Sequence, residues 1–116
     1  MPQLINVYNI NVQCLKNKIL DTEAFLEDDG PIDVLCINEH WMTRGELEIV
    51  NIGGYSLAAS YCRKSVSHGG VCILTSNSFT PVCCLDLDEY CQDLDCELAA
   101  IKYGKIIIIA VYRTSD

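Results

Sequence analysis

The chain has 116 residues, of which 50% are hydrophobic and 21% charged, and its formal net charge is −8. This length suits one small domain and excludes two, and the composition is that of a chain that forms a core, not of a disordered tail. The acidic balance argues against a protein that holds nucleic acid mainly through lysine and arginine. The sequence contains no apolar run of the roughly 18 residues needed for a membrane span. Because residues 1–10 also lack the features of a signal peptide, we expect an intracellular protein.

The first third of the chain predicts a βαβ unit. Residues 4–10 alternate in the manner of a strand, and residues 16–29 place apolar side chains at helical intervals with acidic ones between them. Gly30-Pro31 ends this helix, because proline cannot continue it. Residues 32–37 form a second apolar strand. Strands joined by such a helix are parallel neighbours in a sheet.

Glycine and serine turns separate shorter apolar runs in the remainder of the chain, as in antiparallel strands. Residues 85–97 are acidic and predict a surface loop. Residues 106–110 are apolar on both faces, which is typical of a central strand covered on both sides. The predicted class is α/β (α+β), a mixed sheet with one main helix on its face. The strands expected here are at residues 55–59, 71–75, 79–85, 97–103 and 105–112.

Eight cysteines in so short a chain allow either a disulfide framework or reduced thiols. We favour reduced thiols, because no secretion signal is present and Cys36 and Cys72 lie inside apolar runs, where a free thiol acts as a small hydrophobe. A zinc site is poorly supported. No C-x-x-C motif occurs, and His68 with Cys72 would supply only two ligands.

Polar side chains follow three apolar strands at their carboxyl ends. Asn11 follows the first strand, Glu39 the second, and Tyr112 and Arg113 the last. Ligands of α/β sheets bind outside the carboxyl ends of strands, so we expect these groups to meet. A single carboxylate with water and phosphate oxygens suits Mg²⁺, and amide, phenol and guanidinium groups can hydrogen-bond a phosphate. This pattern predicts a site for a phosphate ester.

Each of these residues also has a simpler interpretation. Asn11 is equally well explained as a turn residue leading into the helix, Glu39 as an exposed acid, and Tyr112 as an aromatic at the rim. His40 is expected at the surface or behind the site, and Trp41 in the core over the edge of the sheet.

The segments NVQCLKNKI, DVLCINEHW, GGY, HGGVCIL and AVYR, in this order, resemble the N-terminal half of the endonuclease/exonuclease/phosphatase superfamily. The resemblance is strongest to the endonuclease domain of LINE-type (non-LTR) retrotransposons. It implies half of a four-layer α/β sandwich that cuts DNA with Mg²⁺ or Mn²⁺, in the nucleus, alongside a reverse transcriptase domain. By this resemblance Glu39 is the metal ligand, Asn11 and Tyr112 are catalytic residues at the scissile phosphate, and Arg113 binds substrate.

The sequence also departs from that family. Gln13 stands where several relatives carry Asp or Asn, and YRTSD replaces the usual YRPP. The family's later G-D-x-N and S-D-H motifs do not occur within residues 1–116. We therefore expect a single partial domain, truncated at its C-terminus, with one inner sheet face bare, and an inactive copy that has lost most of the rate enhancement.

Two other functions remain open at this stage. One is a non-catalytic α/β interaction module descended from the endonuclease domain. The other is a flavodoxin-like nucleotide binder, which is the weaker candidate because no phosphate-binding glycine loop follows the first strand. Gly69-Gly70 precedes a strand, so we interpret it as a turn.

Overall fold

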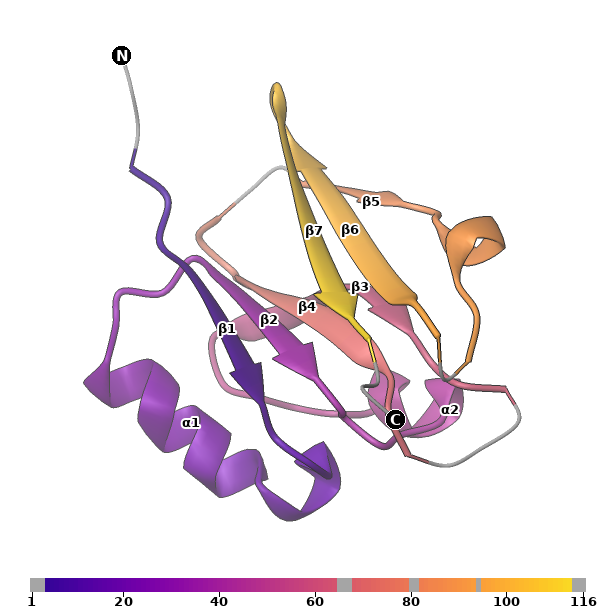
Figure 1. Ribbon diagram of the computed structural model, residues 1–116. Helices are drawn as coiled ribbons and strands as arrows, with labels where there is room; N and C mark the ends of the chain where they lie inside the picture. The colour runs from indigo at the N-terminus through magenta and orange to yellow at the C-terminus, as the bar shows by residue number, and fades with distance from the viewer. Residues whose placement is uncertain (1–3, 65–67, 80–81, 94, 114–116) are drawn as a thin grey trace.

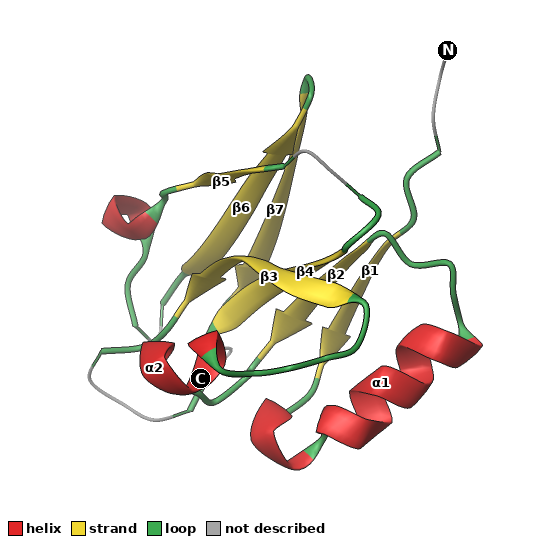
Figure 2. Ribbon diagram, turned by 180° about the vertical axis from the view of Figure 1, so that it is seen from behind, coloured by secondary structure: helices red, strands yellow, loops and turns green. Residues whose placement is uncertain are grey.

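The computed structural model describes residues 4–64, 68–79, 82–93 and 95–113. It has three layers: helices, a four-stranded mixed sheet and a three-stranded antiparallel sheet (Figures 1 and 2). Figure 1 shows α1 (Ile19–Asp28) on one side of the first sheet and the second sheet on the other. The predicted α/β class, a mixed sheet with one main helix on its face, is confirmed.

The strand order is β1-β2-β4-β3 in the first sheet and β5-β6-β7 in the second. None of the described helices has the length and apolar character needed to cross a membrane. The expected strand at residues 79–85 is shorter in the structure, and residues 80–81 lie outside the described part. The remaining elements are β1 (Val7–Asn11), the 3-10 helix Leu15–Asn17, β2 (Val34–Asn38), α2 (Arg44–Glu48), β3 (Tyr55–Tyr61), β4 (Val71–Ser76), β5 (Cys83–Leu85), the 3-10 helix Asp88–Tyr90, β6 (Glu97–Tyr103) and β7 (Ile106–Tyr112).

β1 and β2 are parallel neighbours, as predicted, and their register places Asn11 opposite Asn38. The helix between them begins later than the predicted residue 16. Lys18 has a non-helical backbone, with φ −130° and ψ 25°, and separates a short 3-10 turn from α1. The Lys18 ammonium donates to the Val12 carbonyl at 2.5 Å. This bond holds the segment between β1 and α1 against the end of β1. The helix then ends just before Gly30-Pro31, as expected.

β2 is the strand that the structure buries on both faces. Leu35 and Ile37 belong to the core under the helices, and Val34 and Cys36 to the core between the sheets. All four side chains are at most 3% exposed. Because β2 lies between β1 and β4 in a fully packed layer, the residue that follows it is held by the core of the whole protein.

β7 corrects the prediction of a strand covered on both faces. Ile108 and Ala110 pack against the first sheet, whereas Ile107, Ile109 and Val111 are 54%, 50% and 51% exposed. β7 lies at the edge of its sheet, and in the part of the chain that the structure describes nothing covers its outer face. The expected bare inner face is also wrong, since the two sheets pack on each other and the uncovered face is the outer one.

The cysteines are free thiols, as predicted. Cys36 is 3% and Cys72 0% exposed. Burial raises the pKa of Cys36 to about 11 and also raises that of Cys72, because a thiolate loses its hydration in the core. These two thiols therefore act as small hydrophobes.

Two isoleucines of the second sheet test which face carries the stability. Ile101 on β6 is 0% exposed in the core between the sheets, and Ile107 on β7 is 54% exposed. We expect Ile101→Ala to lower the free energy of unfolding by about 2–5 kcal/mol and Ile107→Ala to change it by less than about 0.5 kcal/mol. Urea unfolding of both variants measures this. Equal losses would contradict the packing described here.

Candidate functional site

Three of the four predicted site residues meet at the carboxyl ends of β1, β2 and β7. The Asn11 side-chain amide donates to Glu39 Oε2 at 2.5 Å, which follows from the register of β1 and β2. The Tyr112 hydroxyl also hydrogen-bonds to the Glu39 carboxylate, and it comes from the other sheet. Arg113 follows Tyr112 and is exposed, with no hydrogen bond or ion pair among the described residues. The carboxylate of Glu39 is thus the centre of the cluster.

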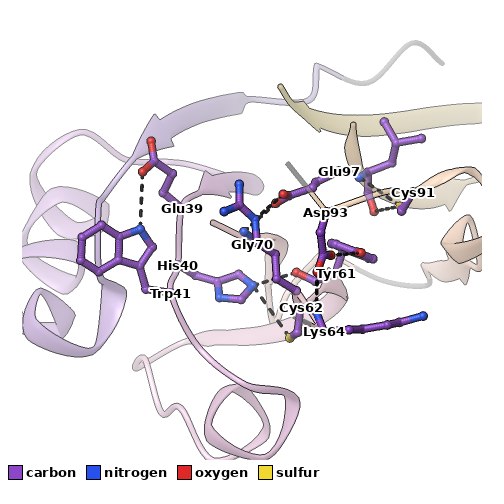
Figure 3. Close-up of polar contacts among 12 residues, drawn as sticks. Glu39, His40, Trp41, Tyr61, Cys62, Lys64, Gly70, Cys91, Asp93 and Glu97 are labelled. Carbon is purple, nitrogen blue, oxygen red and sulfur yellow. Dashed lines mark hydrogen bonds and ion pairs between the residues drawn. The ribbon is translucent and has the colours of Figure 1, made fainter. Parts of the chain in front are cut away.

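Trp41 completes the surroundings of Glu39. Its indole Nε1–H donates to Glu39 Oε1 at 3.4 Å (Figure 3). The ring is half-buried and stacks on His68, with ring centroids 3.9 Å apart. The prediction that Trp41 packs into the core is therefore wrong: the side chain forms part of the site's wall.

The Glu39 carboxyl group is held in its ionised form. Burial raises its pKa, but the hydrogen bonds from Asn11, Tyr112 and Trp41, together with the positive charge of Arg63, lower it below the ordinary value. An ionised carboxylate with three donors has a fixed orientation and a full negative charge at neutral pH. Burial and the bond to Glu39 raise the pKa of Tyr112, so its phenol stays protonated and remains a donor.

The backbone that carries Glu39 is in the left-handed region, which non-glycine residues rarely adopt. Glu39 has φ 61° and Trp41 φ 59°. On one side the Glu39 N–H donates to the Gly70 carbonyl at 2.7 Å and the Trp41 N–H to the Gly69 carbonyl at 2.9 Å. On the other side the Cys14 N–H donates to the Glu39 carbonyl at 3.0 Å. Such a conformation costs of order 1–3 kcal/mol per residue and persists only where the surroundings determine it.

Gly69 and Gly70 form the predicted turn before β4, with φ 87° and 86°. A Cβ on Gly70 would lie 2.5 Å from the His40 ring, so the close approach of this loop to the site requires glycine.

His40 is fully buried, so of the two expected positions, at the surface or behind the site, the structure shows the second. Its Nδ1 accepts from the Met42 N–H at 2.9 Å, so Nε2 carries the proton and donates to the Tyr61 carbonyl at 2.9 Å. Figure 3 shows the ring directed toward Tyr61 and Cys62 and not toward Glu39. Burial lowers the pKa of His40 despite the opposing effects of the Tyr61 bond and the Glu97 charge. This histidine is a neutral structural residue that supports the loop.

Sequence reasoning missed a buried ion pair beside the site. The Arg63 guanidinium donates to Glu97, and the two side chains are only 5% and 1% exposed. Glu97 also accepts from the Gly70 N–H at 2.7 Å. One signal was available in the sequence. Glu97 alternates with Ala99 and Ile101 at every second position, so its charged side chain lies on the same, inward face of β6.

The described residues contain no group of three or more His, Cys, Asp or Glu side chains placed to hold a metal ion. Zinc sites typically use three or four such protein ligands. The ionised Glu39 carboxylate fits a different kind of ion, one that takes a single protein carboxylate and keeps its water, such as Mg²⁺.

No protein-family model and no curated protein matches the sequence. Among solved structures, the fold is similar to that of the 3′ phosphatase NExo from Neisseria, a variant bound to product DNA hairpin. The TM-score is 0.60 at 18% identity, and the match covers 93% of this chain and 40% of that one. The similarity shows that the chain shares the fold of the matched part of that protein. The closeness to retrotransposon endonucleases stays a prediction.

The neutral state of His40 predicts a pH dependence of stability. The unfolded imidazole has a pKa of about 6.5 and the folded one a lower pKa, so acid protonates the unfolded chain first. The contribution of His40 to stability is therefore complete above about pH 6.5 and is lost as the pH falls toward the folded pKa. We expect His40→Gln to flatten the dependence of the unfolding free energy on pH between about pH 7 and pH 5. Urea titrations across this range measure it, and an unaltered slope in His40→Gln would refute the assignment.

The Arg63–Glu97 pair predicts a large loss of stability when one partner is removed. Glu97→Leu leaves the guanidinium buried without its carboxylate and should lower the free energy of unfolding by about 3–5 kcal/mol. The double variant Arg63→Met, Glu97→Leu removes both charges and should lose clearly less. Chemical unfolding of the three proteins provides the comparison. A double variant as unstable as the single one would show that the charge is not the cause.

Proposed function

We propose that the chain carries part of the active site of a Mg²⁺-dependent (or Mn²⁺-dependent) hydrolase that cleaves phosphate esters of DNA. The observation that carries this proposal is the ionised Glu39 carboxylate, joined to Asn11 and Tyr112 where three strands end. The nuclease-type fold and the DNA in the similar structure support the substrate class. The match covers only 40% of that protein's length. The hydrolytic activity itself is therefore part of our proposal.

Each residue has a role that its geometry allows. Glu39 would hold the metal ion, which when bound stabilises negative charge on the phosphate. Asn11 uses one N–H of its amide on Glu39 and has a second for a phosphate oxygen. Tyr112 stays protonated and orients the carboxylate or a phosphate oxygen. Arg113 is exposed beside Tyr112, where its guanidinium can form two parallel bonds to a phosphate.

The general base of such a reaction is not His40, since this ring is buried and its two nitrogens are engaged by the backbone. We therefore expect the chain by itself to hydrolyse DNA slowly. Where several residues of a hydrolase act as a unit, the enzyme loses most of its rate enhancement when one of them is missing.

The motif resemblance alone supports four finer proposals: an origin as the N-terminal part of a retrotransposon endonuclease domain, a single partial domain over residues 1–116, a reverse transcriptase partner, and a nuclear location.

Nicking of a supercoiled plasmid in the presence of Mg²⁺ tests the proposed hydrolysis. We expect slow nicking that chelation abolishes, and we expect Glu39→Gln and Asn11→Ala to reduce its rate by at least about 100-fold. Glu27→Gln is the matched control, because this exposed carboxylate on α1 has the same chemistry away from the site and should leave the rate unchanged. Nicking that persists in Glu39→Gln would overturn the assignment.

A non-catalytic interaction module is the second candidate. The exposed apolar face of β7 and the net charge of −8 favour it, since such a face suits a protein partner better than DNA. Absence of nicking at every protein concentration, from a chain that unfolds cooperatively, would favour this module over the hydrolase.

A further inference from the structure

Trp41 and His68 form a stacked aromatic pair beside the Glu39 carboxylate. Their rings lie 3.9 Å apart between centroids and 16° from parallel. The edge of the indole is bonded to Glu39 Oε1 at 3.4 Å. His68, the second ring of the stack, is an exposed residue. The pair therefore presents a flat aromatic surface that begins at the proposed metal ligand.

The position of the pair is set by backbone and side chain together. The Trp41 N–H donates to the Gly69 carbonyl at 2.9 Å, and Gly69 directly follows His68 in the chain. The indole Nε1–H is bonded to Glu39, and the Trp41 backbone is in the left-handed region, with φ 59°. A backbone bond and a side-chain bond thus hold the indole at a strained turn, against the ring of the residue that precedes Gly69.

The charge of the chain makes such a surface useful to a DNA-binding site. A net charge of −8 repels a polyanion, and among the described residues the exposed cation that directly follows a residue of the site is Arg113. Phosphate contacts therefore cannot supply most of the affinity. Stacking of a base on an aromatic ring is independent of net charge and accepts every base, since each has a π-face.

We propose that the Trp41–His68 pair binds an unpaired nucleobase next to the phosphate at Glu39. This rests on the proposed function and specifies its substrate class: DNA with an unpaired base, as in a single strand, at a frayed end or where supercoiling opens the duplex. A base inside a duplex is stacked on both faces, so it reaches an aromatic ring only after it leaves its neighbours. A base at a strand end or in a single strand continues the Trp41–His68 stack directly.

Trp41 is the only tryptophan in the chain, so its fluorescence reports this site alone. The probe is a short thymidine oligonucleotide in the presence of a chelator, compared with an abasic oligonucleotide of the same length and charge. We expect saturable quenching by the thymidine strand with little dependence on salt, much weaker quenching by the abasic strand, and weaker binding of a blunt duplex.

Variants separate stacking from other contacts. We expect His68→Ala to raise the dissociation constant by about 5-fold to about 150-fold, the range of one base–aromatic stack. His68→Tyr restores an aromatic ring and should bind like the wild type. Tyr90→Ala is the control, because Tyr90 is 64% exposed and is not part of the pair. His68 is exposed, so its variants should keep the fold, and their urea unfolding verifies this.

The outcomes distinguish this proposal from the hydrolase. Quenching by the thymidine strand without hydrolysis in Mg²⁺ would support the stacking site and count against the enzyme. Hydrolysis of abasic and natural strands at equal rates, with no quenching, would overturn the stacking site and leave the enzyme standing. The proposal would also be overturned if the abasic strand or the duplex bound as tightly as the thymidine strand. The same holds if His68→Ala bound the thymidine strand as tightly as the wild type does.

Discussion

The backbone of Gly70 joins the two sheets to the loop that carries the site. Its N–H donates to the Glu97 carboxylate on β6 at 2.7 Å, and its carbonyl accepts from the Glu39 N–H at 2.7 Å. A Cβ at this position would meet the His40 ring at 2.5 Å, so the side chain has to be absent. The left-handed backbone of Glu39 is stable because both ends of this short connection are anchored in packed layers.

The electrostatics of the site follow from the same arrangement. Arg63 is held by Glu97 in the interior, and its positive charge also acts on Glu39. Two carboxylates therefore share one buried cation, although the chain as a whole is strongly acidic. This local balance, with the donors Asn11, Tyr112 and Trp41, keeps Glu39 charged against the opposing effect of burial. A charged and oriented carboxylate at the ends of three strands is the basis for the proposed chemistry.

The limits of prediction from sequence have physical causes. Asn11 and Glu39 were predictable as neighbours, because parallel strands joined by one helix bring their carboxyl ends together. The sequence left His40 at the surface or behind the site, and only the structure decided for the second, because backbone groups of Met42 and Tyr61 satisfy both ring nitrogens inside the fold. The prediction that β7 is covered on both faces was wrong. Its apolar character is continuous, yet one face packs and the other stays exposed among the described residues.

The amino-acid sequence by itself determined the α/β class, the βαβ unit, the reduced thiols and the strand ends that carry Asn11, Glu39 and Tyr112. These follow from periodicity and from turn residues, which act over a few positions along the chain. The tertiary structure alone decided that Tyr112 reaches Glu39 from the second sheet, that Arg63 pairs with Glu97, and that Trp41 stacks on His68. Such contacts depend on how two sheets and a glycine loop pack, and no local pattern encodes the distance between residues that far apart in the chain.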